Sequence, residues 1–202
     1  MITIVDYGLG NINAFLNVYR RLNVQARTAS RAEDLQDASK VILPGVGAFD
    51  HAMERLAASG MRETLDDLVL RRQVPILGVC VGMQILGRDS DEGTLPGLGW
   101  IDGRVRSMAS LTTTLPVPHM GWNDTRTVGS SRLFGGLETD ARFYFLHSYY
   151  FECDRAEDAI ALAAYGDQFA CAVNVGNVYG VQFHPEKSHH YGVQLLKNFA
   201  EI

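Results

Sequence analysis

The residues best suited to chemistry begin with a cysteine placed between two glycines. Residues 78–82 read Gly-Val-Cys-Val-Gly, the thiol version of the G-x-S-x-G pattern, with Cys80 at its centre. The apolar residues 76–77 predict a buried strand before this cysteine, and residues 83–86 predict a helix after it. This order would place the thiol at a helix N-terminus, where the helix dipole favours the thiolate. The pattern predicts a nucleophile elbow, although a buried structural cysteine also fits these five residues alone.

A histidine and a glutamate close to the C-terminus could serve this cysteine. Residues 181–183 predict a buried strand that ends at His184, because Pro185 interrupts it. Glu186 follows two residues later and could hold the imidazole from behind. A thiol nucleophile needs a base to take its proton, and the base needs a group that fixes its tautomer. Cys80, His184 and Glu186 are therefore a candidate triad, although His184 alone would more often be a structural histidine and Glu186 alone a solvated loop acid.

The first half of the chain has the pattern needed to position such a triad. About 90 residues alternate strand-like and helix-like segments, which predicts an α/β fold with an open, mostly parallel twisted sheet and helices on both faces. The expected strands are residues 1–6, 24–28, 41–43 and the strand before Cys80. The glycine turn Gly45-Val46-Gly47 ends the third of these, at the sheet edge where ligands bind in such folds. A second glycine turn, residues 6–11, lacks the third glycine of a dinucleotide-binding fingerprint.

The second half has shorter strands and more turns, and it predicts antiparallel additions to the sheet. We expect strands at residues 100–108, 116–120, 142–151, 159–165, 170–175 and 178–183. The pair Gly176-Asn177 predicts a hairpin, and residues 111–115 predict an exposed hairpin or loop. An apolar stripe near the C-terminus predicts a closing helix that could begin at His189-His190. No linker is visible, so we expect one domain over residues 1–202.

Composition narrows the function classes. The chain has 202 residues, 47% of them hydrophobic, and a net charge of −5, which does not indicate a nucleic-acid or membrane surface. No apolar run reaches the ~20 residues of a bilayer span, and no signal peptide is apparent. Three cysteines without zinc-like spacing favour a reducing, cytoplasmic setting. We expect no metal and no cofactor, and we expect Cys153 and Cys171 to be plain buried or half-buried thiols.

Six sequence blocks resemble motifs of one protein family and occur in the same order along the chain as in that family. The blocks PGVG at 44–47, GVCVGMQ at 78–84 and GVQFHPEKS at 180–188 resemble the class I, or triad, glutamine amidotransferases. More narrowly, DYGLGNI at 6–12, PHMGWN at 118–123 and FYFLHSYY at 143–150 resemble the glutaminase subunits of imidazole glycerol phosphate synthases. The six blocks span nearly the whole chain.

This resemblance implies a mechanism and a set of residues. The thiolate of Cys80 would attack the side-chain amide of glutamine, His184 would transfer protons, and Glu186 would support His184. The resemblance implies an oxyanion site formed by Val81 N–H and the turn Gly45-Val46-Gly47, which could need to reorient before it donates. The positions implied to hold glutamine are Gln84, Ser148 and Tyr149, and those implied to face a partner are Asn11, Trp122 and Lys187.

The resemblance also implies a partner. In the family the subunit docks on a (βα)₈ cyclase, whose barrel carries ammonia to an acceptor and yields imidazole glycerol phosphate for histidine synthesis. We therefore expect a heterodimer whose free glutaminase subunit is only weakly active. Two stretches, residues 95–103 and 187–192, look more like paralogous glutaminases that serve a cyclase homologue in the amidination of surface-polysaccharide sugars.

Two hypotheses from other classes stay open on the sequence. A stand-alone cysteine hydrolase would use the same elbow, although Gln84 and the His147-Ser148-Tyr149 segment favour a glutamine pocket. A non-catalytic regulatory subunit would not need an intact triad. A screen of peptide and ester substrates separates the first hypothesis from a glutaminase, and a Cys80→Ala variant separates the second.

Overall fold

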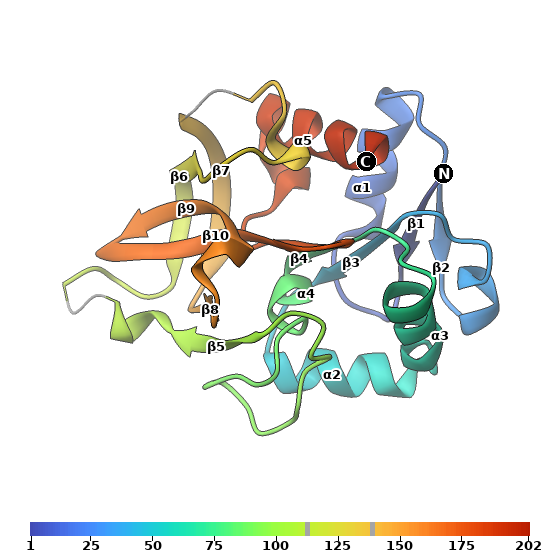
Figure 1. The fold of residues 1–202 in the computed structure, drawn as a ribbon, viewed down its shortest axis with the longest axis horizontal. Coiled ribbons are helices and arrows are strands. Elements are labelled where there is room, and N and C mark those ends of the chain that lie inside the picture. The colour runs from blue at the N-terminus through green and yellow to red at the C-terminus, as the bar shows by residue number, and fades with distance from the viewer. Residues whose placement is uncertain (112–113, 138–139) are drawn as a thin grey trace.

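The computed structural model describes residues 1–111, 114–137 and 140–202, and it has a mixed eleven-stranded sheet between helices (Figure 1). The strands are β1 (Ile2–Val5), β2 (Ala26–Ala29), β3 (Val41–Gly45), β4 (Ile76–Cys80), β5 (Gly103–Ser107), β6 (His119–Thr127), β7 (Asp140–His147), β8 (Tyr149–Cys153), β9 (Ala159–Tyr165), β10 (Asp167–Val175) and β11 (Val178–Val181). The α-helices are α1 (Ile12–Arg21), α2 (Phe49–Ala58), α3 (Arg62–Asp66), α4 (Val81–Gln84) and α5 (His189–Glu201). Short 3₁₀ or π-helical turns are η1 (Ala32–Leu35), η2 (Asp67–Arg71), η3 (Met108–Ser110), η4 (Arg132–Phe134), η5 (Ala156–Asp158) and η6 (Pro185–Lys187).

Five parallel strands form one side of the sheet, in the order β2-β1-β3-β4-β11. Strands β1, β3, β4 and β11 are buried along their whole length, because helices cover both faces of this part of the sheet. Helices α1 and α5 lie on one face, and α2, α3 and α4 lie on the other (Figure 1). This confirms the predicted α/β sheet.

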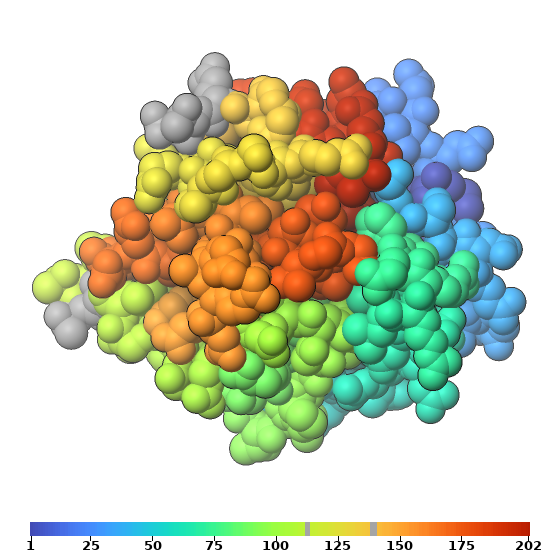
Figure 2. All heavy atoms as spheres, in the orientation of Figure 1, coloured from blue at the N-terminus to red at the C-terminus, as the bar shows by residue number. Residues whose placement is uncertain are grey.

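The remaining strands are antiparallel and continue the sheet beyond β11. Strand β10 pairs with β11 and β9, and β9 leads to the long pair β6–β7. In Figure 2 the strands around residues 150–175, in orange, lie between the yellow segment near residue 130 and the green segment near residue 100. The predicted hairpin at Gly176-Asn177 is confirmed, since Val175 pairs with Val178 across it.

Most predicted strands are found with limits shifted by one to three residues, and two differ from the structure more substantially. The aromatic segment 142–151 is not one strand, because it divides at Ser148 into β7, which pairs with β6, and β8, which pairs with β5 and β10. The strand expected at residues 116–120 instead begins at His119 and runs to Thr127, since the two prolines before it have no N–H to donate. Residues 112–113 of the expected loop at 111–115 lie outside the described part of the chain.

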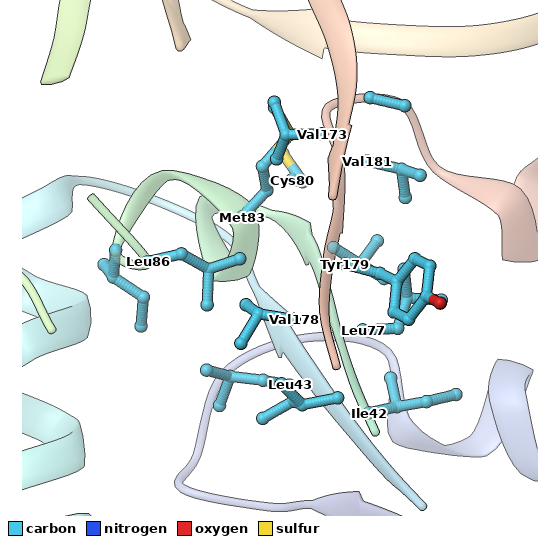
Figure 3. Packing of buried hydrophobic residues seen from close by; sticks show 14 of the residues in the cluster. Ile42, Leu43, Leu77, Cys80, Met83, Leu86, Val173, Val178, Tyr179 and Val181 are labelled. Atoms are coloured by element: carbon cyan, nitrogen blue, oxygen red, sulfur yellow. The ribbon is translucent and has the colours of Figure 1, made fainter. Parts of the chain in front are cut away.

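The core is continuous from the first strand to the last helix. Apolar side chains of β3, β4, β10 and β11 pack around Leu43, Leu77 and Val178, with Cys80 at one end beside Val173 and Met83 (Figure 3). Helix α1 buries Phe15, Val18 and Tyr19, as its amphipathic spacing predicts. No helix within the described ranges is both long and apolar enough to cross a membrane.

Candidate active site

Three neighbouring parallel strands bring the candidate residues to one edge of the sheet. Gly45 at the end of β3 is paired with Cys80 at the end of β4. Val181 at the end of β11 is paired with Val79, so His184, three residues later, extends to the same edge. The carboxyl ends of adjacent parallel strands are where α/β sheets bind ligands. The topology therefore juxtaposes segments that lie more than one hundred residues apart in the sequence.

Cys80 occupies a strained turn between β4 and α4. Its backbone has φ +56° and ψ −115°, a region that residues with a side chain rarely adopt. Gly82 permits the turn, because a Cβ there would lie 1.9 Å from the carbonyl oxygen of Leu43. A Cβ at Gly78 would lie 2.5 Å from the carbonyl oxygen of Gly82. The strand–turn–helix order and the tight backbone are those of a nucleophile elbow.

The helix after the elbow begins two residues earlier than the sequence predicts. We predicted helix at residues 83–86, whereas α4 is a single turn, Val81–Gln84. A one-turn helix has a smaller dipole than a long one, so its field at the thiol is correspondingly modest. Its N–H groups, including that of Val81, have no partner within the helix and lie next to Cys80 at its N-terminus.

His184 and Glu186 form a buried pair at the end of β11. The Nδ1 of His184 lies 2.9 Å from Oε1 of Glu186, and their side chains are 5% and 3% exposed. An ionised carboxylate only accepts hydrogen bonds, so Nδ1 of His184 carries a proton. The other ring nitrogen, Nε2, can then exchange a proton with a thiol. The other carboxylate oxygen, Oε2, is buried and has no partner among the described residues.

A clamp from β7 fixes the backbone of His184. Its N–H donates to the carbonyl of Tyr144 at 2.9 Å. The fully buried Ser188 hydroxyl donates to the carbonyl of His184 at 2.6 Å and accepts the N–H of Tyr144 at 2.9 Å. Tyr144 thus bonds the N–H of His184 directly and its carbonyl through Ser188, which fixes the backbone that carries the imidazole.

The electrostatics of the site favour a protonated His184. Burial disfavours the imidazolium, but hydrogen bonds to Cys80 and Glu186, with their negative charges, raise the pKa of His184 to about 9. At neutral pH His184 is therefore protonated beside the sulfur, the state that serves a thiolate nucleophile.

A cavity of about 280 Å³ opens over Cys80 and His184. It is lined by Val46, Gly47, Cys80, Val81, Gln84, Glu92, Pro118, Leu146, His147, Ser148, Tyr149, His184 and Lys187. The three residues predicted to hold substrate, Gln84, Ser148 and Tyr149, all lie in its wall. The division between β7 and β8 at Ser148 is what turns this segment towards the cavity. A small polar molecule with an amide near Cys80 fits this arrangement.

The predicted oxyanion turn divides into two parts. Gly45 is buried beneath the elbow and does not line the cavity; a Cβ there would lie 2.4 Å from the N of Gly82. Val46 and Gly47 line the cavity and are exposed, and Gly47 has φ +92° with open space around its missing Cβ. The turn is thus tightly packed at one end and unconstrained by neighbours at the other.

The residues predicted to face a partner lie in different settings. Trp122 is exposed on β6, where its ring stacks on His189 at 5.1 Å. Lys187 is exposed at the cavity wall, with Nζ 5.7 Å from the centre of the Tyr144 ring. Asn11 is the N-cap of α1 and accepts the N–H of Ala14 at 3.2 Å. Its side chain therefore has a structural role already.

A buried network behind the cavity was not predicted from the sequence. It runs from Asn123 through His119 and His147 to the carbonyl of Tyr149, with links of 3.2, 2.8 and 2.8 Å. From that carbonyl it continues through Gln84 and Gln182 to Cys80. A glutamine inside the buried strand at 181–183 was the available signal, because a buried amide requires partners.

Within the ranges described, no three His, Cys, Asp or Glu side chains lie close enough to hold a metal ion. Cys171 is buried and Cys153 is half-buried, and both are free thiols, as predicted.

Comparison with known proteins agrees with the geometry. The profile of the family "Glutamine amidotransferase class-I" matches residues 3–202. The chain is 61% identical to the imidazole glycerol phosphate synthase subunit HisH of Bdellovibrio bacteriovorus, with all of both chains covered. It is 50% identical to the subunit of the same name from Leptospira interrogans, again over all of both chains.

Solved structures show the same fold at low sequence identity. A crystal structure described as a glutamine amidotransferase has a TM-score of 0.77 and 18% identity, covering 100% of this chain and 99% of the other. The structure of PurLQS from Thermotoga maritima has a TM-score of 0.75 and 16% identity, covering 99% and 97%. Together with the family profile and the full-length relatives, these likenesses identify the chain as an enzyme of the class I glutamine amidotransferase family.

Proposed function

We propose that the chain is the glutaminase subunit of an imidazole glycerol phosphate synthase, which hydrolyses glutamine and passes the ammonia to a cyclase. The observation that carries the chemistry is the Cys80–His184–Glu186 arrangement at the edge of the sheet, with a cavity over its sulfur. The relatives at 61% and 50% identity, which bear that subunit's name, support the pathway.

The triad residues divide the work of amide hydrolysis. Cys80 gives its proton to Nε2 of His184, and its sulfur attacks the amide carbon of glutamine. The resulting tetrahedral intermediate collapses when His184 protonates the amide nitrogen, so that the C–N bond breaks and ammonia leaves. Water, deprotonated by His184, then attacks the γ-glutamyl thioester, and the C–S bond breaks to give glutamate and the free sulfur. Glu186 keeps Nδ1 protonated and stabilises the imidazolium throughout.

The oxyanion is assigned to backbone donors on both sides of the sulfur. Val81 N–H lies at the N-terminus of α4, and Val46 and Gly47 lie across the cavity. The open surroundings of Gly47 support a turn that reorients before it donates. Gly45 supports the elbow from beneath instead of donating into the cavity.

Gln84, Ser148 and Tyr149 are assigned to the amino-acid end of glutamine. The two amide hydrogens of Gln84 are directed to Tyr149 and Gln182, so the side-chain oxygen is the part of this residue left for a substrate ammonium. Ser148 and Tyr149 border the same cavity at the start of β8.

An apolar surface beside the cavity supports the cyclase partner. Met120 and Leu146 are paired across β6 and β7 and are 65% and 39% exposed. Trp122 follows on the same face at 43% exposure. Ammonia released at Cys80 would be protonated in water, so a (βα)₈ cyclase that covers this surface would keep it neutral for its own reaction. The lyase step and the acceptor belong to that partner, and we place the heterodimer in the cytoplasm.

The test is glutamate release from glutamine by the chain alone and with a histidine-pathway cyclase carrying an acceptor analogue. We expect strong stimulation by the cyclase, and no release from a Cys80→Ala complex that still uses added ammonium. Activity that this cyclase does not stimulate would instead favour the surface-polysaccharide partner. Cleavage of peptides or esters at rates above glutamine would favour a stand-alone hydrolase.

A further inference from the structure

Gln182 is a buried polar residue to which the proposed mechanism gives no task. It lies between the end of β11 and His184 and is 0% exposed. Its backbone N–H donates to the carbonyl of Cys171 at 2.9 Å, which ties this position into the sheet. A side-chain amide buried at this depth is costly unless its oxygen and nitrogen both have partners. The partners of Gln182 therefore indicate what the side chain does.

The orientation of the Gln182 amide is fixed by groups that cannot reverse their roles. The carbonyl of Tyr149 only accepts hydrogen bonds, and Nε2 of Gln84 lies 3.1 Å from it. The amino end of Gln84 therefore faces Tyr149, and the same nitrogen lies 3.1 Å from Oε1 of Gln182. Since Gln84 donates there, the oxygen of Gln182 must face Gln84. The amide nitrogen of Gln182 is left on the opposite side.

That nitrogen lies against the sulfur of the nucleophile. Nε2 of Gln182 is 3.9 Å from Sγ of Cys80, within reach of an N–H···S hydrogen bond. The carbonyl of Tyr149 also accepts Nδ1–H of the buried His147 at 2.8 Å. Two hydrogen bonds, from Gln84 and His147, therefore fix the position of this carbonyl. If the Gln182 amide were flipped, its oxygen would face the sulfur and its NH₂ group would face the NH₂ group of Gln84. Two donors would then oppose each other, so this orientation is disfavoured.

We propose that Gln182 is a positioning residue that donates an N–H to the Cys80 sulfur from the protein interior and stabilises its thiolate. The proposal rests on the proposed role of Cys80 as the nucleophile. The sulfur is negative before it attacks the amide and again when the thioester breaks. The donor acts at both moments, whereas it gains little from the neutral thioester between them. His184 exchanges the proton on the cavity side, and Gln182 holds the sulfur on the protein side.

Several titratable groups surround this sulfur and contribute to its pH response. From β1 onwards along the chain, the groups that interact with Cys80 or share its cavity are Tyr7, Glu92, His147, Tyr149, His184 with Glu186, and Lys187. Gln182 differs from all of them because it does not titrate. Its removal changes the hydrogen bonding of the sulfur without adding or deleting a charge.

The test follows the pH at which iodoacetamide alkylates Cys80, measured by mass spectrometry on the intact chain. Gln182→Met keeps the length of the side chain and removes the donor. We expect its alkylation midpoint to rise by about one pH unit, as loss of a hydrogen bond to a charged group predicts. We expect glutaminase kcat/KM in the cyclase complex to fall about tenfold at neutral pH and to recover in part at higher pH.

Two controls separate this effect from general damage. Gln194→Met makes the same change on α5, where the amide donates to Asn198 at 2.8 Å, and it should leave the midpoint unchanged. Cys80→Ala removes the labelled site, and burial raises the pKa of the Cys153 thiol to about 12, so little label should remain. A lower melting temperature with an unchanged midpoint in Gln182→Met would overturn the proposal and leave Gln182 a packing residue.

A measurement on the unmodified chain covers the case in which Gln182→Met does not fold. In ¹⁵N-glutamine-labelled protein, the side-chain NH₂ signal of Gln182 should shift with pH in step with Cys80 alkylation, and it should not shift in Cys80→Ala. A Gln182 side-chain signal whose chemical shift does not change as Cys80 ionises would overturn the inference. The proposed function would fail separately, through glutaminase activity that survives Cys80→Ala.

Discussion

The triad depends on a histidine whose protonation is set by its two neighbours. Burial alone would make His184 easier to deprotonate, yet Cys80 and Glu186 hold the proton on the ring and raise its pKa to about 9. In the proposed mechanism His184 carries a proton to release ammonia, so activity should decline as the pH rises through this value. The acid that orients the histidine thus also determines the alkaline limit of the reaction.

The first prediction concerns Glu186→Gln. Because the amide carries no charge, the pKa of His184 should fall, and the alkaline limb of the kcat/KM profile should move from near pH 9 to lower pH by about one unit. The rate at neutral pH should fall less than in His184→Ala, for which we expect a loss of about 10²–10⁴-fold. Glutamate release across pH 6–10 in the cyclase complex measures both effects. An alkaline limb that does not move, or a larger loss in Glu186→Gln, would contradict the role given to Glu186.

At the scale of elements, the elbow is held by close contact between β3 and α4. Gly45 and Gly82 meet where the ends of these elements cross, and neither has room for a side chain. The strained backbone of Cys80 is maintained by this contact and by the pairing of β4 with β3 and β11. Backbone packing therefore holds Cys80 in the wall of the cavity.

The second prediction follows from that packing. In Gly82→Ala the new Cβ would lie 1.9 Å from the carbonyl oxygen of Leu43, so β3 and α4 must separate. We expect a loss of at least about 3 kcal/mol in the free energy of unfolding, measured by urea denaturation. Gly135→Ala is the matched control, because its Cβ would have 3.4 Å to the nearest atom and should cost little. Equal stabilities of the two variants would contradict the steric account.

The buried histidines His119 and His147 link the β6–β7 pair to the wall of the cavity. Burial lowers the pKa of His119 to about 4 and that of His147 to about 3. Nδ1 of His147 donates to Tyr149, so its Nε2 accepts from Nδ1–H of His119, and Nε2 of His119 accepts from Asn123. Both rings are neutral in the folded protein, because any further proton would lack an acceptor there.

The third prediction is a loss of stability in mild acid. Both pKa values lie below the ordinary 6.5, so the unfolded chain binds protons more tightly and the free energy of unfolding falls as pH drops below about 6.5. The fall should continue until the folded-state values near 3–4 are reached and should amount to several kcal/mol. Urea denaturation at pH 5, 6, 7 and 8 measures it. His119→Asn keeps a donor for His147 with one titrating ring fewer, and its slope below pH 6.5 should be smaller; an equal slope would exclude this origin.

The strands and the candidate triad, which stays a prediction, could be proposed from the sequence because their signals are local. Buried strands are short apolar runs, and Cys80, His184 and Glu186 each follow such a run at a turn. The division of the aromatic segment at Ser148 was not accessible, since it depends on which strands lie beside β7 and β8. The Gln84–Gln182 link is likewise set by contacts between residues about one hundred positions apart.

At the scale of the whole molecule, the two halves of the sheet have different tasks. The parallel half positions Cys80 and His184, and the antiparallel half supplies part of the cavity wall, including Leu146, His147 and Tyr149. The outer face of β6–β7 is apolar next to the cavity, where Met120, Trp122 and Leu146 are exposed. Further along, the same face carries the ion pair of Arg142 with Asp124, at 2.7 Å. Apolar surface is thus concentrated where ammonia would leave.

The last prediction tests whether the cyclase binds at the apolar rim formed by the exposed side chains of Met120, Trp122 and Leu146. Met120→Asp places a charge in the apolar surface, and it should weaken cyclase binding at least about tenfold and remove most stimulation of glutamate release. Leu70→Asp is the matched control, since Leu70 is a similarly exposed apolar residue, 55% against 65%, on η2. Titration of each variant with cyclase by calorimetry gives the affinities, and iodoacetamide labelling of Cys80 reports the free site, which neither change should alter. Equal binding of the two variants would mean that the cyclase covers another surface, and the rim would then need a different explanation, because ammonia leaving beside Met120 would meet water.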